Sequence, residues 1–164
     1  MSTSTFTISY THTVTYVTAK MLLLLKEIIR EIGLDPSKLA HDWGSYEAAM
    51  STWLTSRHLQ KVTLEVYDPT NDRLITRWDL DIEYGPTGDG ALWVDTAAIH
   101  YQILKAGLVP SSCQYQIKLV SPGGRAVPGW GTVPFRSTLG FNRYCIGATI
   151  GGNGISTQAS YWGR

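Results

Sequence analysis

Apolar residues recur at two different periods near the start of the chain. Between residues 6 and 16 they alternate with threonine and serine, which is the period of a β-strand. From Val14 onward they follow the three- and four-residue spacing of a helix, and Gly33 then provides a stop signal. The helical set is Val17, Met21, Leu22, Leu25, Ile28, Ile29 and Ile32. We therefore predict a short strand near residues 4–9 and a buried helix over about residues 10–32.

The pattern predicts two further helices and three more strand segments. Ser45 is suited to capping a helix, and the apolar face of that helix consists of Tyr46, Met50, Trp53 and Leu54. A third helix is expected over about residues 91–106, ended by Gly107. A strand follows over residues 111–120. The tail from Phe141 contains two short β-like pieces around a Gly-Gly-Asn-Gly turn, with no strong core signature.

The clearest strand signal is a hairpin. The segments KVTLEVY (61–67) and RLITRWDLDIEY (73–84) are joined by the turn-rich link DPTND. Alternation places Val62, Leu64 and Val66 on one face together with Trp78, Leu80 and Ile82. If paired residue numbers sum to about 142, Lys61 lies opposite Asp81 and Glu65 lies opposite Arg77. Both are favourable cross-strand charge pairs, so we predict this register with a solvated charged face.

Three carboxylates on the second strand of this hairpin raise the question of catalysis. Asp79, Asp81 and Glu83 occupy alternate positions, about 7 Å apart on one face, which suits a two-metal site. A nucleotidyltransferase also needs a Gly-Ser turn shortly before that strand, but Gly44–Ser45 is separated from it by a helix and a strand. Neither a Walker lysine loop nor a Gly-x-Gly-x-x-Gly pattern is present. We favour a non-catalytic strand face and keep a metal-dependent nucleotidyl or phosphoryl transferase as the alternative.

Charge and composition narrow the classes of function. There are 14 basic and 13 acidic residues and no basic stripe, so direct nucleic-acid binding is not expected. Charged residues make up only 16% of the chain, which leaves a neutral, hydrogen-bonding exterior suited to packing against another protein. The length of 164 residues predicts one domain over residues 1–164. The four histidines show no metal-ligand spacing, so we expect no metal and no cofactor.

The expected compartment is the cytoplasm. No secretory signal peptide is visible, and charged residues interrupt the apolar run MLLLLKEIIREIGL well before the length of a membrane span. Cys113 and Cys145 are therefore interpreted as free thiols of a cytoplasmic protein, without a disulfide between them.

The central segment, WLTSRHLQKVTLEVYDPTNDRLITRWDLDIEY, resembles the HORMA-domain family. The matching residues are Trp53–Leu54, Gln60–Lys61–Val62 and the run Arg77–Trp78–Asp79–Leu80–Asp81–Ile82–Glu83. The order of elements also follows the HORMA plan, and the start and compact length resemble bacterial HORMA proteins of cyclic-oligonucleotide (CBASS) antiphage operons. The resemblance implies an α+β fold, with a central three-helix layer packed on an antiparallel sheet. It also implies a core over about residues 1–137 and a C-terminal safety-belt hairpin over about residues 138–164.

The resemblance implies a binding switch instead of an enzyme. HORMA domains capture a short closure-motif peptide beside an edge strand and wrap the safety belt across it, and an AAA+ remodeller pulls the N-terminal segment to reopen them. In the bacterial systems the closed form binds and activates a cGAS/DncV-like nucleotidyltransferase. The peptide comes from a paired HORMA protein or from the nucleotidyltransferase. An unrelated peptide-binding α+β module is the remaining alternative.

Carried over to this chain, the resemblance assigns three sets of residues. The edge strand that receives the peptide is 113–120, backed by the helix at 91–106, with Cys113, Tyr115, Ile117 and Leu119 as binding residues. The belt residues are Tyr144, Ile146, Ile150, Ile155 and Tyr161. The handle for the remodeller includes Ser2, Thr3, Ser4 and Thr5. Glycines in the belt lower the cost of changing its strand register.

Overall fold

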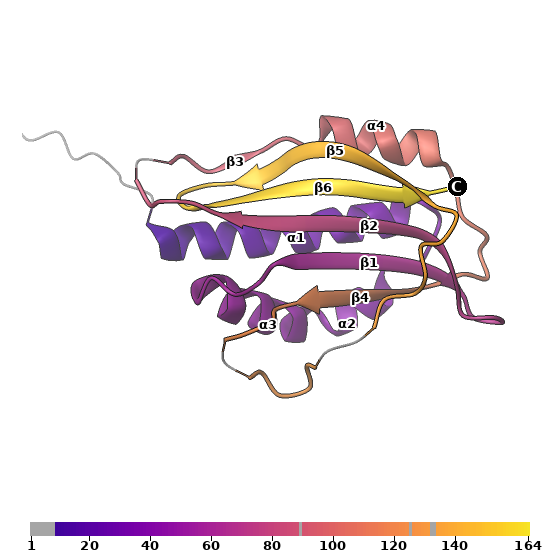
Figure 1. Cartoon of the computed structure of the whole chain (residues 1–164), viewed down its shortest axis with the longest axis horizontal. Coiled ribbons are helices and arrows are strands. Elements are labelled where there is room, and N and C mark those ends of the chain that lie inside the picture. The colour runs from indigo at the N-terminus through magenta and orange to yellow at the C-terminus, as the bar shows by residue number, and fades with distance from the viewer. Residues whose placement is uncertain (1–8, 89, 125, 132–133) are drawn as a thin grey trace, which may run out of the picture.

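The protein is a six-stranded sheet with helices packed against one face (Figure 1). The computed structural model describes residues 9–88, 90–124, 126–131 and 134–164. The sheet order is β3-β5-β6-β2-β1-β4, and each described pair of neighbours is antiparallel. The helices are α1 (Tyr10–Glu31), α2 (Ser37–His41), α3 (Trp43–Thr55) and α4 (Ala97–Ala106). The strands are β1 (Lys61–Asp68), β2 (Arg73–Tyr84), β3 (Trp93–Val94), β4 (Gln114–Val120), β5 (Asn142–Gly151) and β6 (Ile155–Gly163). The predicted α+β class is confirmed.

Helix α1 is the centre of the core, as its apolar spacing predicts. The hydroxyl of Ser9 accepts a hydrogen bond from the backbone N–H of His12 (3.0 Å), which caps the helix at its start. Gly33, at φ +94°, follows its end in a conformation that glycine adopts without strain. The predicted strand near residues 4–9 lies outside the described residues, except for Ser9 itself. The predicted handle, Ser2 to Thr5, also lies outside them.

The other helices differ in extent from the predictions. Helix α3 begins at Trp43, before the expected cap Ser45, because the backbone N–H of Tyr46 already donates to the carbonyl of Asp42 (3.1 Å). The short helix α2 was not predicted. Helix α4 is shorter than the expected 91–106, since residues 93–94 pair with β5 as strand β3. Gly107 ends α4 at φ +77°, as predicted.

The β1–β2 hairpin has the predicted register. Lys61 pairs with Asp81 and Glu65 pairs with Arg77, with one irregularity between Val66 and Tyr67. The alternating apolar side chains on the two strands face the helices and are almost completely buried. The apolar period therefore fixes both the face and the register of this hairpin.

The C-terminal hairpin is more deeply integrated than its glycine-rich sequence suggests. β5 and β6 are ten- and nine-residue strands, and β6 pairs with β2 from Arg77–Trp162 to Tyr84–Ile155. The expectation of two short pieces with no strong core signature is wrong, since Ile150 and Ile155 belong to the buried core. Helix α4 packs against β5 and β6, so the predicted backing of β4 by this helix is also wrong. Figure 1 shows α4 at the opposite edge of the sheet from β4.

If the hairpin is part of the core, trimming it will destabilise the whole domain. Ile150 is 0% exposed, so we expect Ile150→Ala to lower the free energy of unfolding by about 3 kcal/mol, measured by urea denaturation. Ile146→Ala, on the same strand at a half-buried position, is the matched control and should cost about 1 kcal/mol. A loss for Ile150→Ala of only about 1 kcal/mol, no larger than that of the control, would show that the hairpin is not part of the cooperative core.

Candidate functional site

Strand β4 forms one edge of the sheet and pairs with a described strand only on its inner side, with β1. The N–H of Gln60, just before β1, donates to the carbonyl of Val120 on β4 (2.8 Å), so Val120 turns this carbonyl toward β1. Because backbone direction alternates along a strand, the even-numbered residues of β4 face β1 in the same way. Odd-numbered residues of β4 therefore direct their N–H and C=O groups away from the sheet.

This outward set includes three of the four residues that the sequence proposed for peptide binding, which are Tyr115, Ile117 and Leu119; the N–H of the fourth, Cys113, donates to the carbonyl of Pro110 (3.0 Å). Their side chains, however, lie in or against the hydrophobic core, and Cys113 itself precedes the first residue of β4. Burial raises the pKa of the Cys113 thiol, with a further contribution from Asp68. Cys113 and Cys145 are both free, as predicted. Tyr115, Ile117 and Leu119 therefore offer a partner their backbone rather than their side chains.

Helices α2 and α3 lie behind β4, where the sequence had placed α4. The hydroxyl of Tyr115 donates to the carbonyl of Asp35 (2.9 Å) and accepts from the N–H of Leu39 (3.2 Å), which fastens α2 to the strand. On the outer side, the ammonium of Lys38 donates to the carbonyl of Tyr115 (3.2 Å). This contact agrees with the outward direction of that carbonyl.

The segment between β4 and β5 encloses this edge. We call residues 126–131 and 134–141 of this segment the strap. Figure 1 shows the chain leaving β4, running beyond the sheet edge and returning across β4 and β1 to reach β5. Its first anchor is Trp130, whose ring lies edge-on to Tyr46 (5.1 Å between centroids) and Trp53 (6.5 Å) of α3. Burial in this aromatic cluster raises the pKa of Tyr46 to about 12, with smaller contributions from Asp42 and Tyr115.

The second anchor of the strap is a buried carboxylate. Glu65, which is 0% exposed, accepts from the backbone N–H of Arg136 (2.8 Å) and from its guanidinium (2.8 Å). The ammonium of Lys118 lies 2.5 Å from the same carboxylate and donates to the strap carbonyl of Pro134 (2.6 Å). We call Glu65, Lys118 and Arg136 the Glu65 latch. A buried charge is tolerated only when it is paired and hydrogen-bonded, so the latch fixes where the strap crosses the sheet.

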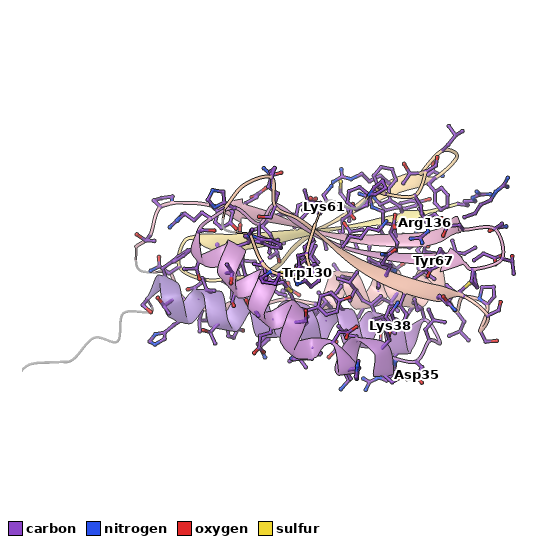
Figure 2. The ribbon with its side chains drawn as sticks, turned by 90° about the horizontal axis from the view of Figure 1, so that it is seen from below. Asp35, Lys38, Lys61, Tyr67, Trp130 and Arg136 are labelled. Atoms are coloured by element: carbon purple, nitrogen blue, oxygen red, sulfur yellow. The ribbon has the colours of Figure 1, made fainter. Side chains whose placement is uncertain are left out.

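Further contacts hold the guanidinium of Arg136 in the latch. It donates to Gln116 (3.1 Å) and to Asp72 (2.9 Å), and it lies 3.6 Å from the centre of the Tyr67 ring. Figure 2 shows Arg136 and Tyr67 side by side. One strap residue is thereby joined to β4, to β1 and to the turn between β1 and β2.

The prediction that the charged face of the hairpin is solvated is wrong. Thr63, Glu65, Arg77 and Asp79 are all buried. The strap residue Phe135 covers the guanidinium of Arg77 (4.3 Å), and the indole of Trp162 on β6 donates to Asp79 (3.0 Å). Both covering residues are distant in sequence from the hairpin, so local alternation does not reveal them.

The three carboxylates that raised the question of catalysis are paired with cations or exposed: Lys61 lies near both Asp79 (3.9 Å) and Asp81, and Glu83 is exposed. Asp79 is 1% exposed and is held by two bonds from Arg77 (2.8 and 3.0 Å) and by Thr63 (2.8 Å). Asp81 lies near Lys61 (3.5 Å) and Arg143 (3.7 Å). Among the described residues, no group of three His, Cys, Asp or Glu side chains is placed to hold a metal ion. The contacts of Asp79 and Asp81 are those of structural ion pairs.

A cavity of about 530 Å³ lies between the end of β4 and the strap. Its lining includes Trp53, Leu119, Trp130 and Phe135, and is largely apolar and aromatic. An edge strand with free backbone groups and adjacent side-chain pockets is the arrangement that captures an extended peptide by strand addition.

The predicted belt residues occupy both sides of the C-terminal hairpin. Ile150, Ile155 and Tyr161 are buried, Ile146 is half-buried and Tyr144 is exposed. Tyr161 packs on Trp78 (4.4 Å between centroids). The residues that actually cross the sheet, Phe135 and Arg136, precede the predicted belt start at residue 138. The sequence patterns therefore did not indicate Lys38, Trp130 or Arg136 as site residues, and the aromatic and basic residues of "GWGTVPFR" were the only local signal for the last two.

The whole chain matches one known family. The family model described as bacterial HORMA domain 2 matches residues 1–164. Comparison with curated proteins gives no match. Among the described residues, no helix is both long and apolar enough to cross a lipid bilayer.

Solved structures with low sequence identity share the fold. A chain of the mitotic checkpoint complex is 10% identical with a TM-score of 0.75, and the match covers 92% of this chain and 98% of that one. A chain from the structure of C. elegans HTP-2 bound to the HIM-3 closure motif is 13% identical with a TM-score of 0.57, over 92% and 87% of the two chains. A chain of the E. coli MS115-1 CdnC:HORMA-deltaN complex is 14% identical with a TM-score of 0.53, over 98% and 90%.

The Glu65 latch predicts that one arginine determines the position of the strap. Arg136→Ala removes the guanidinium that pairs with the buried carboxylate of Glu65. We therefore expect the free energy of unfolding to fall by about 3 kcal/mol. Amide hydrogen exchange in residues 134–141 should also accelerate. Arg143→Ala removes an exposed arginine that lies 3.7 Å from Asp81 and should cost at most about 1 kcal/mol. Unchanged exchange in the strap of Arg136→Ala would show that the latch does not hold it.

Proposed function

The chain belongs to the bacterial HORMA domain 2 family, and on that premise we propose that it captures a closure-motif peptide along the outer edge of β4, beneath the strap. The single observation that carries this proposal is the unpaired outer side of β4, enclosed by a strap anchored on both α3 and the sheet face. A peptide strand added there gains backbone hydrogen bonds from Tyr115, Ile117 and Leu119, and the aromatic cavity receives its side chains. This is a binding function that requires no catalytic residue.

The site lies on the side of the sheet away from the C-terminal hairpin. Because β5 and β6 pair next to β2, at the other side of the sheet, they leave the edge of β4 available. We therefore assign peptide enclosure to the strap, which shares residues 138–141 with the predicted belt over about 138–164. The belt residues from Tyr144 to Tyr161 hold the far end of the strap in place through their pairing with β2.

We further propose a signalling role in the bacterial cytoplasm. In this proposal the peptide-bound form binds and activates a cGAS/DncV-like nucleotidyltransferase, and an AAA+ ATPase reopens the domain by pulling on the segment that contains Ser2 to Thr5. The support is family membership and the shared fold with a chain of the CdnC:HORMA-deltaN complex. Cyclic-oligonucleotide synthesis by a purified CdnC-type enzyme, with and without this chain and a bound peptide, tests activation. Deleting residues 2–8 should abolish ATP-driven peptide release and leave capture intact.

Proline substitution tests strand addition directly. The N–H of Leu119 points away from β1, so Leu119→Pro removes a donor that the fold itself does not use, and edge strands tolerate such a proline. We expect peptides selected from a displayed random 12-residue library on the wild-type protein to bind Leu119→Pro at least about tenfold more weakly, measured by isothermal titration.

Leu119→Ala is the matched control because it shortens the same side chain and keeps the N–H. It should retain binding within about threefold, and both variants should show cooperative thermal unfolding. Equal binding by Leu119→Pro and Leu119→Ala would contradict capture at this edge. A selection that enriches no peptide on the wild-type protein would contradict the proposed function itself.

A further inference from the structure

The ammonium of Lys38 occupies the site where a bound peptide has to pair. Its Nζ donates to the outward carbonyl of Tyr115 (3.2 Å) and lies 5.7 Å from the centre of the ring of the same residue. Within the described part of the chain, no carboxylate lies within ion-pair distance of Lys38. The cation is therefore held at the sheet edge by the neutral carbonyl and the aromatic ring of Tyr115.

The backbone that carries Lys38 is fixed in place. The N–H of Leu39, the next residue, donates to the hydroxyl of Tyr115, and the Leu39 side chain is buried. The carboxylate of Asp35 accepts from the N–H of Ser37 (2.9 Å) at the start of α2, and it lines the same cavity as Lys38. Figure 2 shows Lys38 and Asp35 at the same end of the helical layer. Only the flexible stem of Lys38 is free to move when the edge is filled.

A cavity of about 450 Å³ opens beside this contact. Its lining includes Gly33, Asp35, Lys38, Ser111 and Tyr115. It lies at the start of β4, whereas the aromatic cavity lies at the end of β4, next to Trp130. A peptide running the length of the strand reaches both cavities, and the two ends of the site differ in chemistry: one carries charged side chains, including the ammonium of Lys38, and the other is aromatic.

An added strand changes the partner of Lys38. A backbone N–H of the added peptide donates to the Tyr115 carbonyl, and it therefore competes with the Lys38 ammonium for this acceptor. The displaced ammonium is a compact point charge on a four-carbon stem, and a carboxylate is its strongest protein partner. We propose that Lys38 determines peptide specificity by selecting an aspartate or glutamate beside the peptide residue that pairs with Tyr115. This inference rests on the proposed function, because it concerns the same edge.

The test compares peptide selections on three proteins. A phage-displayed random 12-residue library is panned on the wild type, Lys38→Glu and Lys38→Met. We expect acidic residues to be enriched at one position on the wild type, basic residues at that position on Lys38→Glu, and neither on Lys38→Met. Binding of the best wild-type peptide should weaken about 3- to 10-fold in Lys38→Met at low salt, and this difference should shrink in 1 M NaCl.

Lys20→Met is the matched control. The ammonium of Lys20 also lies over a tyrosine ring, that of Tyr16 (5.5 Å), but Lys20 belongs to α1, which packs on α3, β5 and β6. This variant should bind the wild-type peptide within about twofold. Lys38 is exposed, so its variants should unfold within a few degrees of the wild type.

The failure of this inference is distinguishable from failure of the proposed function. If the selected peptides show no acidic preference, or the same preference on all three proteins, the proposed role of Lys38 is wrong. Peptide capture at the β4 edge is then still supported. Lys38 then serves only to block unwanted pairing at an exposed edge, as lysines on edge strands do. A wild-type selection that yields no binding peptide overturns both.

Discussion

The buried carboxylate of Glu65 is the constraint on which the arrangement of the site depends. A fully desolvated carboxylate requires cationic and hydrogen-bonding partners. One partner, Lys118, comes from the neighbouring strand β4, and the other, Arg136, comes from the strap. Because both bonds from Arg136 converge on this one side chain, the strap crosses the sheet at a single place. The enclosure of the β4 edge follows from that crossing and from the anchoring of Trp130 on α3.

The strap and the C-terminal hairpin are held by different forces. Buried ion pairs contribute little net stability, but they strongly disfavour arrangements in which one partner is left alone. A latch of this kind specifies one position for the strap without making it the most stable part of the fold. The hairpin, in contrast, buries Ile150, Ile155 and Tyr161. At about 2 kcal/mol for each of these side chains, peeling it away costs on the order of 6 kcal/mol before hydrogen bonds are considered. A barrier of that size is consistent with the proposal that reopening uses an ATP-driven remodeller.

The sequence predicts the parts of this fold that local periodicity and charge pairing determine. Helix α1 and the register of the β1–β2 hairpin follow from residues close together in the chain. The burial of Arg77 and Asp79 could not be predicted in this way, because Phe135 and Trp162 cover them from 58 and 83 positions away, respectively. The same limit applies to the site. The resemblance located the edge strand. In the structure the side chains of β4 proposed for peptide binding lie in or against the core, which leaves the outward backbone groups to a partner, and only the folded chain brings Lys38 and Arg136 to this strand.

The most direct test of capture at this edge is residue-resolved amide hydrogen exchange by NMR, with and without a library-selected peptide. Strand addition predicts new protection at the outward amides of Tyr115, Ile117 and Leu119. The intervening amides of Gln116 and Lys118, already paired with β1, should change little. This two-residue alternation is specific to backbone pairing on the outer side of β4. Peptide binding that protects all five amides equally, or none of them, would contradict capture at this edge.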